Sequence, residues 1–158
     1  MKRILLVVVC SCLMTGTFAQ KSLTSAQKNF QNSIVNFLKE EGYAPSIDND
    51  GWIAFKSEGK SFWIIIESES PFFVVFKRSG FKVGGSDGFK YVSSLLACNE
   101  VNKELRAVKM YCDSESVLLQ IEQYTRSAED FKYAFYKNLE VLAVAAKKFV
   151  EEYETYEE

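Results

Sequence analysis

The chain has 158 residues, a net charge of −2, four cysteines and no histidine. A weakly acidic chain lacks the positive field with which proteins attract nucleic acid. Without histidine, the usual general base and metal ligand are missing, and serine or cysteine nucleophiles have no imidazole to activate them. We therefore expect no catalysis, no metal centre, no cofactor and no nucleic-acid partner.

The first residues have the pattern of a secretory signal peptide. Two basic residues, Lys2 and Arg3, precede an apolar run that ends at Leu13, and small residues follow as far as Ala19. This order of segments is typical of exported proteins, and the apolar run is too short to span a membrane. We predict that residues 1–19 form a signal peptide.

Cleavage between Ala19 and Gln20 would leave residues 20–158 as a single domain, periplasmic or secreted, and would lower the net charge to −4. A lipoprotein anchored at Cys12 is the alternative, although Cys10 fits the usual lipidation pattern poorly. Either way, we expect no stable membrane span in the mature chain.

The first helix is predicted over Ser22–Glu41. Thr24 and Gln27 have the spacing of a capping box, and Gly42 is suited to end the helix. The acidic turn that follows, Asp48–Gly51, lacks the full pattern of a calcium loop and is expected to lie in solvent.

The segment from Trp52 to Phe76 predicts three antiparallel strands. A turn at Glu58–Gly59 pairs Phe55 with Phe62. Alternation then places two sets of apolar side chains on opposite faces: Ile53, Phe55, Phe62, Ile64 and Ile66 on the first, and Trp52, Ala54, Trp63 and Ile65 on the second.

The third strand depends on the next loop. A two-residue loop at Glu69–Ser70 puts Phe73 and Val75 on the first face and Val74 and Phe76 on the second, and a slip of one residue would exchange them. Because both faces are apolar, each needs a cover; leaving such a side chain in water forgoes roughly 1.5–3 kcal/mol.

The remaining chain predicts a helix, two strands and a final helix. The helix is expected over Phe89–Lys103, with Phe89, Val92, Leu95 and Leu96 packed inward and Val101 as a further candidate. The strands are expected over Leu105–Cys112 and Ser116–Gln123. The Gly-rich segment before this helix, residues 83–88, lacks a phosphate-binding motif, so we interpret it as a connector that ends in a cap at Ser86 or Asp87.

The last helix, capped by Ser127, is expected to reach about Tyr153. Its core stripe is Phe131, Phe135, Leu139, Leu142, Ala146, Phe149 and Tyr153. Val141 and Val144 lie off this stripe, so the helix predicts burial on two sides.

Two cysteines, Cys98 and Cys112, remain in the mature chain. Counting helix and strand rises back from their connection suggests that the two sulfurs lie at different heights, too far apart for a disulfide. We expect two free thiols, with their redox state open.

The predicted fold is α+β, in the order helix, three strands, helix, two strands, helix, with one five-stranded antiparallel sheet. With the apolar FWIIIES…PFFVVF hairpin, this order resembles the type III secretion chaperone-like fold and, within it, the YbjN-like family of sensory transduction regulators. The resemblance implies homodimers that bind polypeptide segments on apolar patches, with no cofactor and no catalytic residues. Secretion chaperones work in the cytoplasm, so an exported chain would retain only the general binding role.

We therefore expect a non-enzymatic, exported, homodimeric binding module that captures a protein or peptide segment on an apolar sheet face. A carrier of a small apolar ligand or lipid is the alternative, and a second face covered within the monomer would leave a plain globule. The predicted partner-binding residues are Trp52, Trp63, Ile65, Val74, Phe76, Val141 and Val144.

Overall fold

The computed structural model describes residues 23–69, 71–83, 88–113 and 115–157. The predicted signal peptide, Cys12, and the predicted cap at Ser86 or Asp87 lie outside the described residues. The elements are α1 (Ser25–Glu40), β1 (Ser46–Ile47), β2 (Ile53–Ser57), β3 (Lys60–Ile66), β4 (Phe72–Arg78), α2 (Gly88–Glu104), β5 (Lys109–Cys112), β6 (Val117–Thr125) and α3 (Ala128–Glu157).

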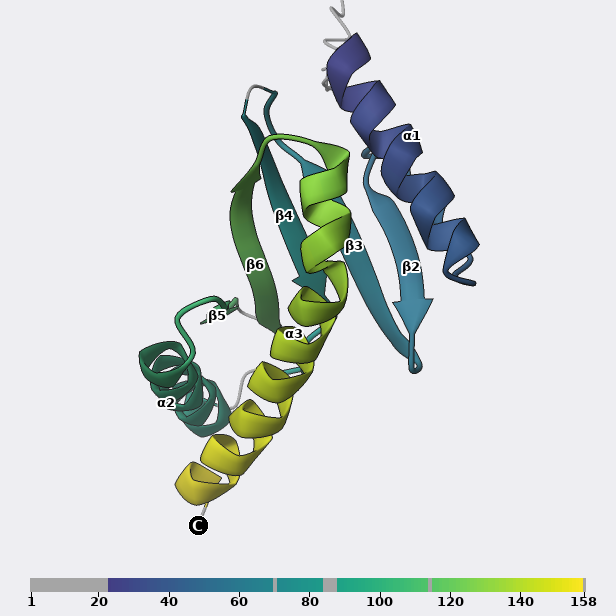
Figure 1. Cartoon of the computed structure of the whole chain (residues 1–158). Helices are drawn as coiled ribbons and strands as arrows, with labels where there is room; N and C mark the ends of the chain where they lie inside the picture. The colour runs from purple at the N-terminus through teal and green to yellow at the C-terminus, as the bar shows by residue number, and fades with distance from the viewer. Residues whose placement is uncertain (1–22, 70, 84–87, 114, 158) are drawn as a thin grey trace, which may run out of the picture.

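The fold is α+β, as the sequence predicts, with one antiparallel sheet in the order β1-β2-β3-β4-β6-β5. The sheet has six strands rather than five, because the two residues of β1 pair with the start of β2. Helices α1 and α3 lie on the same face of the sheet, whereas α2 lies beside the carboxyl-terminal half of α3 at one end of the molecule (Figure 1).

Helix α1 begins and ends where its sequence indicates. The Thr24 hydroxyl accepts a hydrogen bond from the Gln27 amide at 3.2 Å, and the Gln27 side chain accepts one from the Thr24 amide at 3.0 Å. Gly42 follows the helix with φ +83°, which glycine adopts without strain. The side-chain amide of Gln27 also donates to the carbonyl of Ile66 at 3.3 Å, so the capping residue ties α1 to the end of β3.

The first hairpin is confirmed. Glu58 and Gly59 both have positive φ, 49° and 74°, as a type I′ turn requires, and Phe55 pairs with Phe62. The face that includes these two phenylalanines packs against α1 and α3 and forms the core, so we call it the inner face and the opposite one the outer face.

The register predicted for the second hairpin is wrong by one residue. Ile66 pairs with Val74, and the Glu67 amide donates to the Phe73 carbonyl. A two-residue loop would have made Ser68 and Pro71 the first hydrogen-bonded pair, but proline has no N–H to donate. Instead the Ser68 hydroxyl closes a longer loop, accepting from the Phe73 amide at 3.1 Å and donating to the Pro71 carbonyl at 3.2 Å.

This shift exchanges the two faces of β4. Val74 and Phe76 point inward and are fully buried, whereas Phe73 and Val75 lie on the outer face. The Phe76 ring stacks on Phe135 of α3 at a centroid distance of 5.7 Å. The prediction that Val74 and Phe76 bind a partner is therefore wrong; they are core residues.

Helix α3 supplies most of the inner layer. Ser127 caps it by accepting from the Asp130 amide at 3.2 Å, as predicted. The predicted stripe is confirmed: Leu139 and Tyr153 are partly buried against the core, and the buried members are Phe131, Phe135, Leu142, Ala146 and Phe149.

Helix α2 buries Val101, as predicted, but turns a different side inward from the one expected for its four large apolar residues. Its inward side consists of small residues and one valine, which lets it approach α3 and β5 closely: Ser93, Ser94, Ala97, Cys98 and Val101. The large apolar residues expected to pack are exposed: Phe89, Val92, Leu95 and Leu96. We call these four residues the α2 ridge. An apolar pattern over most of a helix does not say which side is covered.

The open edge of the sheet at β5 is closed by a side chain. The amide of Asn102 in α2 donates to the Met110 carbonyl at 2.7 Å and accepts from the Met110 N–H at 2.9 Å. Asn102 thus occupies the position of a paired residue on a neighbouring strand and fixes α2 against the edge.

Both cysteines are free thiols, Cys98 buried and Cys112 half-buried, and the same contact revises only the separation predicted for them. The Cys112 side chain adds to the effect of burial in raising the Cys98 pKa, which indicates that the two thiols face each other at similar heights. From the Asn102–Met110 contact, Cys98 lies four residues back along α2, a rise of about 6 Å. Cys112 lies two residues further along β5, a rise of about 6.6 Å. The prediction miscounted two nearly equal distances.

Candidate functional site

The outer face of the sheet carries no helix in the described part of the chain (Figure 1). Strand pairing divides this face into two halves. The half formed by β2, β3 and β4 is apolar, and the half formed by β5 and β6 is mainly polar. The sequence predicted this contrast between strands that are apolar on both faces and strands that are apolar on one.

The apolar half has Ile65 and Val75 at its centre. These two residues pair across β3 and β4 and are 9% and 8% exposed, although no helix lies over them. Trp52 and Trp63 are half-buried beside them. The predicted binding residues Trp52, Trp63 and Ile65 do lie together on the outer face.

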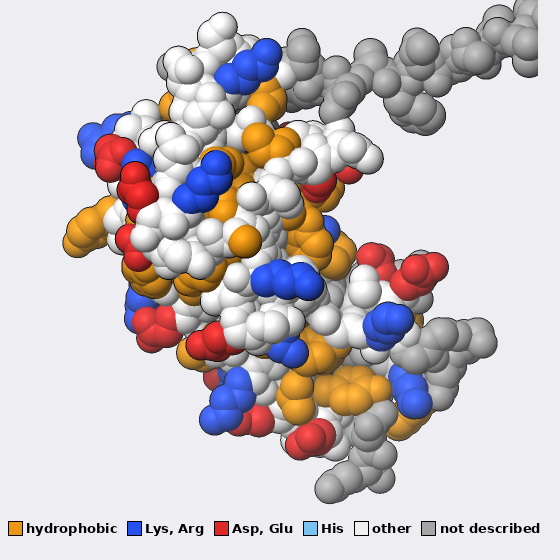
Figure 2. All heavy atoms as spheres, turned by 90° about the vertical axis from the view of Figure 1, so that its right-hand side faces the viewer, with side chains coloured by type: hydrophobic (Ala, Val, Ile, Leu, Met, Phe, Trp, Pro, Cys, Tyr) orange, Lys and Arg blue, Asp and Glu red, His pale blue; other side chains and the backbone are white. Residues whose placement is uncertain are grey.

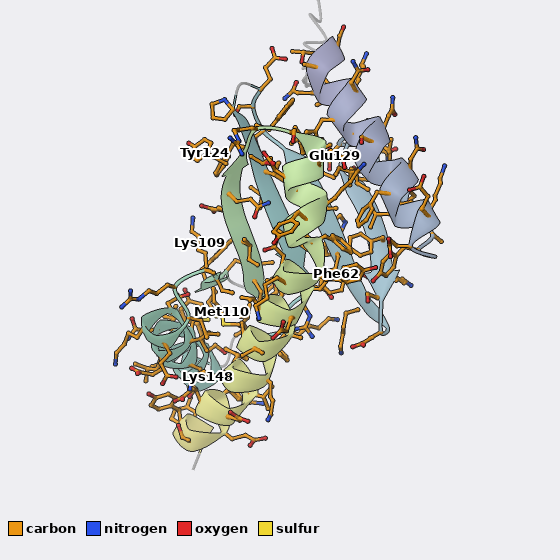
Figure 3. The ribbon with its side chains drawn as sticks, viewed as in Figure 1. Phe62, Lys109, Met110, Tyr124, Glu129 and Lys148 are labelled. Carbon is orange, nitrogen blue, oxygen red and sulfur yellow. The ribbon has the colours of Figure 1, made fainter. Side chains whose placement is uncertain are left out.

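Phe73 and Val75 take the places that the prediction gave to Val74 and Phe76. Phe73 pairs with Tyr124, and their rings lie 5.0 Å apart between centroids. Tyr124 is 72% exposed and extends the apolar half across to β6 (Figure 3). The missing N–H of Pro71 is the sequence signal that places Phe73 and Val75 on the outer face.

The two predicted valines of α3 do not join this surface, because α3 lies on the inner side of the sheet. Val141 is partly buried against the core. Val144 is 47% exposed but remains on the helix, away from the tryptophans. Helices α1 and α2 both contact α3 within the chain but leave Val144 exposed.

A hollow of about 370 Å³ lies beside the two tryptophans. We call it the tryptophan groove; it is lined by Trp52, Trp63, Lys77, Ser79, Gly80, Phe81, Lys82, Ser116 and Leu118. A second hollow of about 270 Å³ lies on the other side of Trp63, along the edge of β2, so this indole separates two depressions.

The wall of the tryptophan groove is built where the chain leaves β4. Gly80 runs so close to β6 that an added Cβ would lie 1.5 Å from the Val117 carbonyl oxygen. The Val117 amide donates to the Phe81 carbonyl at 2.7 Å, and Lys82 then bridges to Ser116. This close approach, which only glycine permits, places Phe81 and Lys82 at the rim.

The charge in the groove is positive. Lys77 and Lys82 are the charged residues among those that line it in the described structure. Next to it, the polar half of the outer face is neutralised internally, because Lys109 pairs with Glu122 at 3.0 Å. That hydrogen bond lowers the pKa of the Glu122 carboxyl. Positive charge is thus concentrated at the groove, where it is partly offset by the Coulombic interaction of Lys77 with Asp113.

A further hollow of about 320 Å³ opens between the first hairpin and α3, with Arg78 in its lining. The Arg78 guanidinium donates to the Leu142 carbonyl at 3.1 Å, and burial lowers the Arg78 pKa. Glu58 and Glu140 also line this hollow, so it offers charges of both signs.

Figure 2 shows the side of the molecule on which α1 lies, with charged side chains spread over the surface and hydrophobic ones gathered between them. The α2 ridge is a group of exposed apolar residues on a single helix; Phe89 is 62% and Val92 52% exposed. Sequence reasoning identified these residues but assigned them to the core.

Comparisons with protein-family models, with curated proteins and with solved structures give no match. Among the described residues, no group of three or more His, Cys, Asp or Glu side chains could hold a metal ion. No helix of the described chain combines the length and apolar character of a membrane span.

Proposed function

We propose that this protein is a non-enzymatic binding module that captures a polypeptide segment on the outer face of its sheet. The observation that carries the proposal is the tryptophan groove: a hollow beside two half-buried indoles, on a face that no described helix covers. Aromatic side chains at such positions supply much of the energy of peptide binding.

The groove also suggests the chemistry of the segment. Its floor accepts an aromatic or aliphatic side chain, and Lys77 and Lys82 favour carboxylates beside that anchor. We therefore propose a segment with an apolar residue flanked by Glu or Asp. Secretory export and homodimer formation belong to the same proposal, with the α2 ridge as an exposed apolar surface available for self-association.

Intrinsic fluorescence tests the proposal directly, because Trp52 and Trp63 are the two tryptophans of the chain and both line the groove. The probes are tryptophan-free synthetic peptides with a central Phe or Leu flanked by Glu, and the same peptides with Lys in place of Glu. We expect a saturable blue shift with the acidic peptides and a weaker one with the basic peptides.

The variant Trp63→Lys should abolish this binding while the fold remains. Tyr133→Lys is the matched control, because Tyr133 is 95% exposed on α3 and lies away from the groove. The remaining signal of Trp52, or polarisation of a labelled peptide, reports binding in the variant. Equal binding by both variants, or no saturable response to any peptide, contradicts the proposal.

Native mass spectrometry of the purified protein separates the alternatives. A dimer mass supports self-association, and a variant with Val92→Glu and Leu96→Glu in the α2 ridge should remove it. A small apolar molecule bound to the wild type and lost from Trp63→Lys would instead favour the carrier alternative.

A further inference from the structure

The pair of cysteines between α2 and β5 has a geometry that two independent free thiols would not require. Cys98 lies on the inward side of α2 and is 3% exposed. Cys112 ends β5, pairs with Val117 and is half-buried. The Cys112 side chain lies close enough to Cys98 to add to the effect of burial in raising the Cys98 pKa.

The elements that carry them are held in place independently of the sulfurs. Asn102, one helical turn beyond Cys98, makes two hydrogen bonds to the backbone of Met110, two strand residues before Cys112. At the other end of α2, the Ser93 hydroxyl donates to the Tyr156 carbonyl of α3 at 3.3 Å. Lys148 of α3, beside α2 in Figure 3, pairs with Glu104 at 2.6 Å.

We propose that Cys98 and Cys112 form a disulfide that locks α2 to the edge strand β5. The oxidant is an external disulfide, either a small-molecule disulfide or a thiol–disulfide oxidoreductase. Because Cys98 and Cys112 lie at similar distances from the Asn102–Met110 contact and their elements are fixed at several points, the bond can form without separating α2 from the sheet.

The order of the two exchange steps follows from burial. Cys112 is the more accessible thiol, so its thiolate attacks one sulfur of the external disulfide, forming a mixed disulfide and releasing one thiolate. The Cys98 thiolate then attacks the Cys112 sulfur, forming the internal bond and releasing the second thiolate. The two cysteine protons pass through solvent to the released thiolates, so one external disulfide is reduced for each bond formed.

Burial raises the pKa of the Cys98 thiol to about 12 and also raises that of Cys112. Both groups are therefore protonated at neutral pH, and the exchange should accelerate as pH rises because the thiolate is the nucleophile. A slow reaction with small disulfides and a faster one with an oxidoreductase are expected.

The test uses the purified full chain, first reduced and then incubated with glutathione disulfide at pH 8. Free thiols are alkylated and the protein is digested with trypsin without reduction. Cleavage after Lys103 and Lys109 puts the two cysteines in separate peptides, residues 91–103 and 110–126, so a linked pair demonstrates the bond. This mapping also separates the pair from Cys10 and Cys12.

We expect the linked peptides, and a melting temperature roughly 5–10 °C higher than that of the reduced protein, since the bond closes a 15-residue loop. Cys98→Ala and Cys112→Ala should each remove both effects. Persistent glutathione on Cys112 with no linked peptide overturns the proposal. A linked pair that lowers the melting temperature also overturns it, because the native geometry would then not accommodate the bond.

Discussion

The inner and outer faces of β3 and β4 are equally apolar but have different environments. Phe76 on the inner face is fully buried under α3, whereas Val75, the preceding residue, lies on a face without a helix. Val75 and Ile65 still reach low exposure, because they pair at the centre of the sheet beside the two tryptophans. The difference between the two faces shows that a side chain at the centre of a sheet can have low exposure without a helix packed over it.

The largest expected effect is on the inner face. Phe76→Ala should lower the free energy of unfolding by about 3–5 kcal/mol, because it leaves a cavity among stacked rings. Val75→Ala in the same strand is the matched control and should cost about 1 kcal/mol, since the outer face can admit water. Urea unfolding measures both, and equal costs would mean that the outer face is as rigidly packed as the core.

The next largest loss of stability is expected for Asn102→Ala, at the edge of the sheet. Losing two hydrogen bonds to the Met110 backbone should cost about 1–3 kcal/mol. Asn99→Ala, at an exposed position on the same helix, should have little effect. Hydrogen exchange gives a sharper measurement: the Met110 amide should lose protection in Asn102→Ala, and unchanged protection would show that another group closes the edge.

Trp63→Lys should cost no more than about 1 kcal/mol of stability, although it removes peptide binding. The indole lies between two hollows on the outer face, where the longer polar side chain can reach water. Thermal unfolding compared with Tyr133→Lys measures the difference. If Trp63→Lys instead unfolds the protein as Phe76→Ala does, the outer face belongs to the core.

The smallest effect is expected at the turn that joins β2 to β3. Glu58→Asn should stabilise the protein by about 0.5 kcal/mol, because Glu58 has φ 49° and asparagine adopts this region at lower cost. The contrasting variant Gly59→Ala, at φ 74°, should destabilise it. A loss of stability in Glu58→Asn would indicate that the Glu58 side chain has a role beyond the turn.

Local chemistry made much of the fold predictable. The Thr24–Gln27 box, the Glu58–Gly59 turn and the Ser127 cap each act within a few residues, and all three are confirmed. The candidate site was predicted in part, with Trp52, Trp63 and Ile65 correct and the β4 residues exchanged. The error came from one loop, since a shift of one residue turns every side chain of a strand to the other face.

Sequence by itself determined that this protein has an α+β fold and that its three central strands are apolar on both faces, because periodicity and turn chemistry are properties of neighbouring residues. Only the tertiary structure decided which face α1 and α3 cover, that α2 buries its small residues and exposes its large ones, and that α2 packs against β5 near Cys98 and Cys112. These features depend on packing between segments far apart in the chain, where shape and available space select one apolar surface over another.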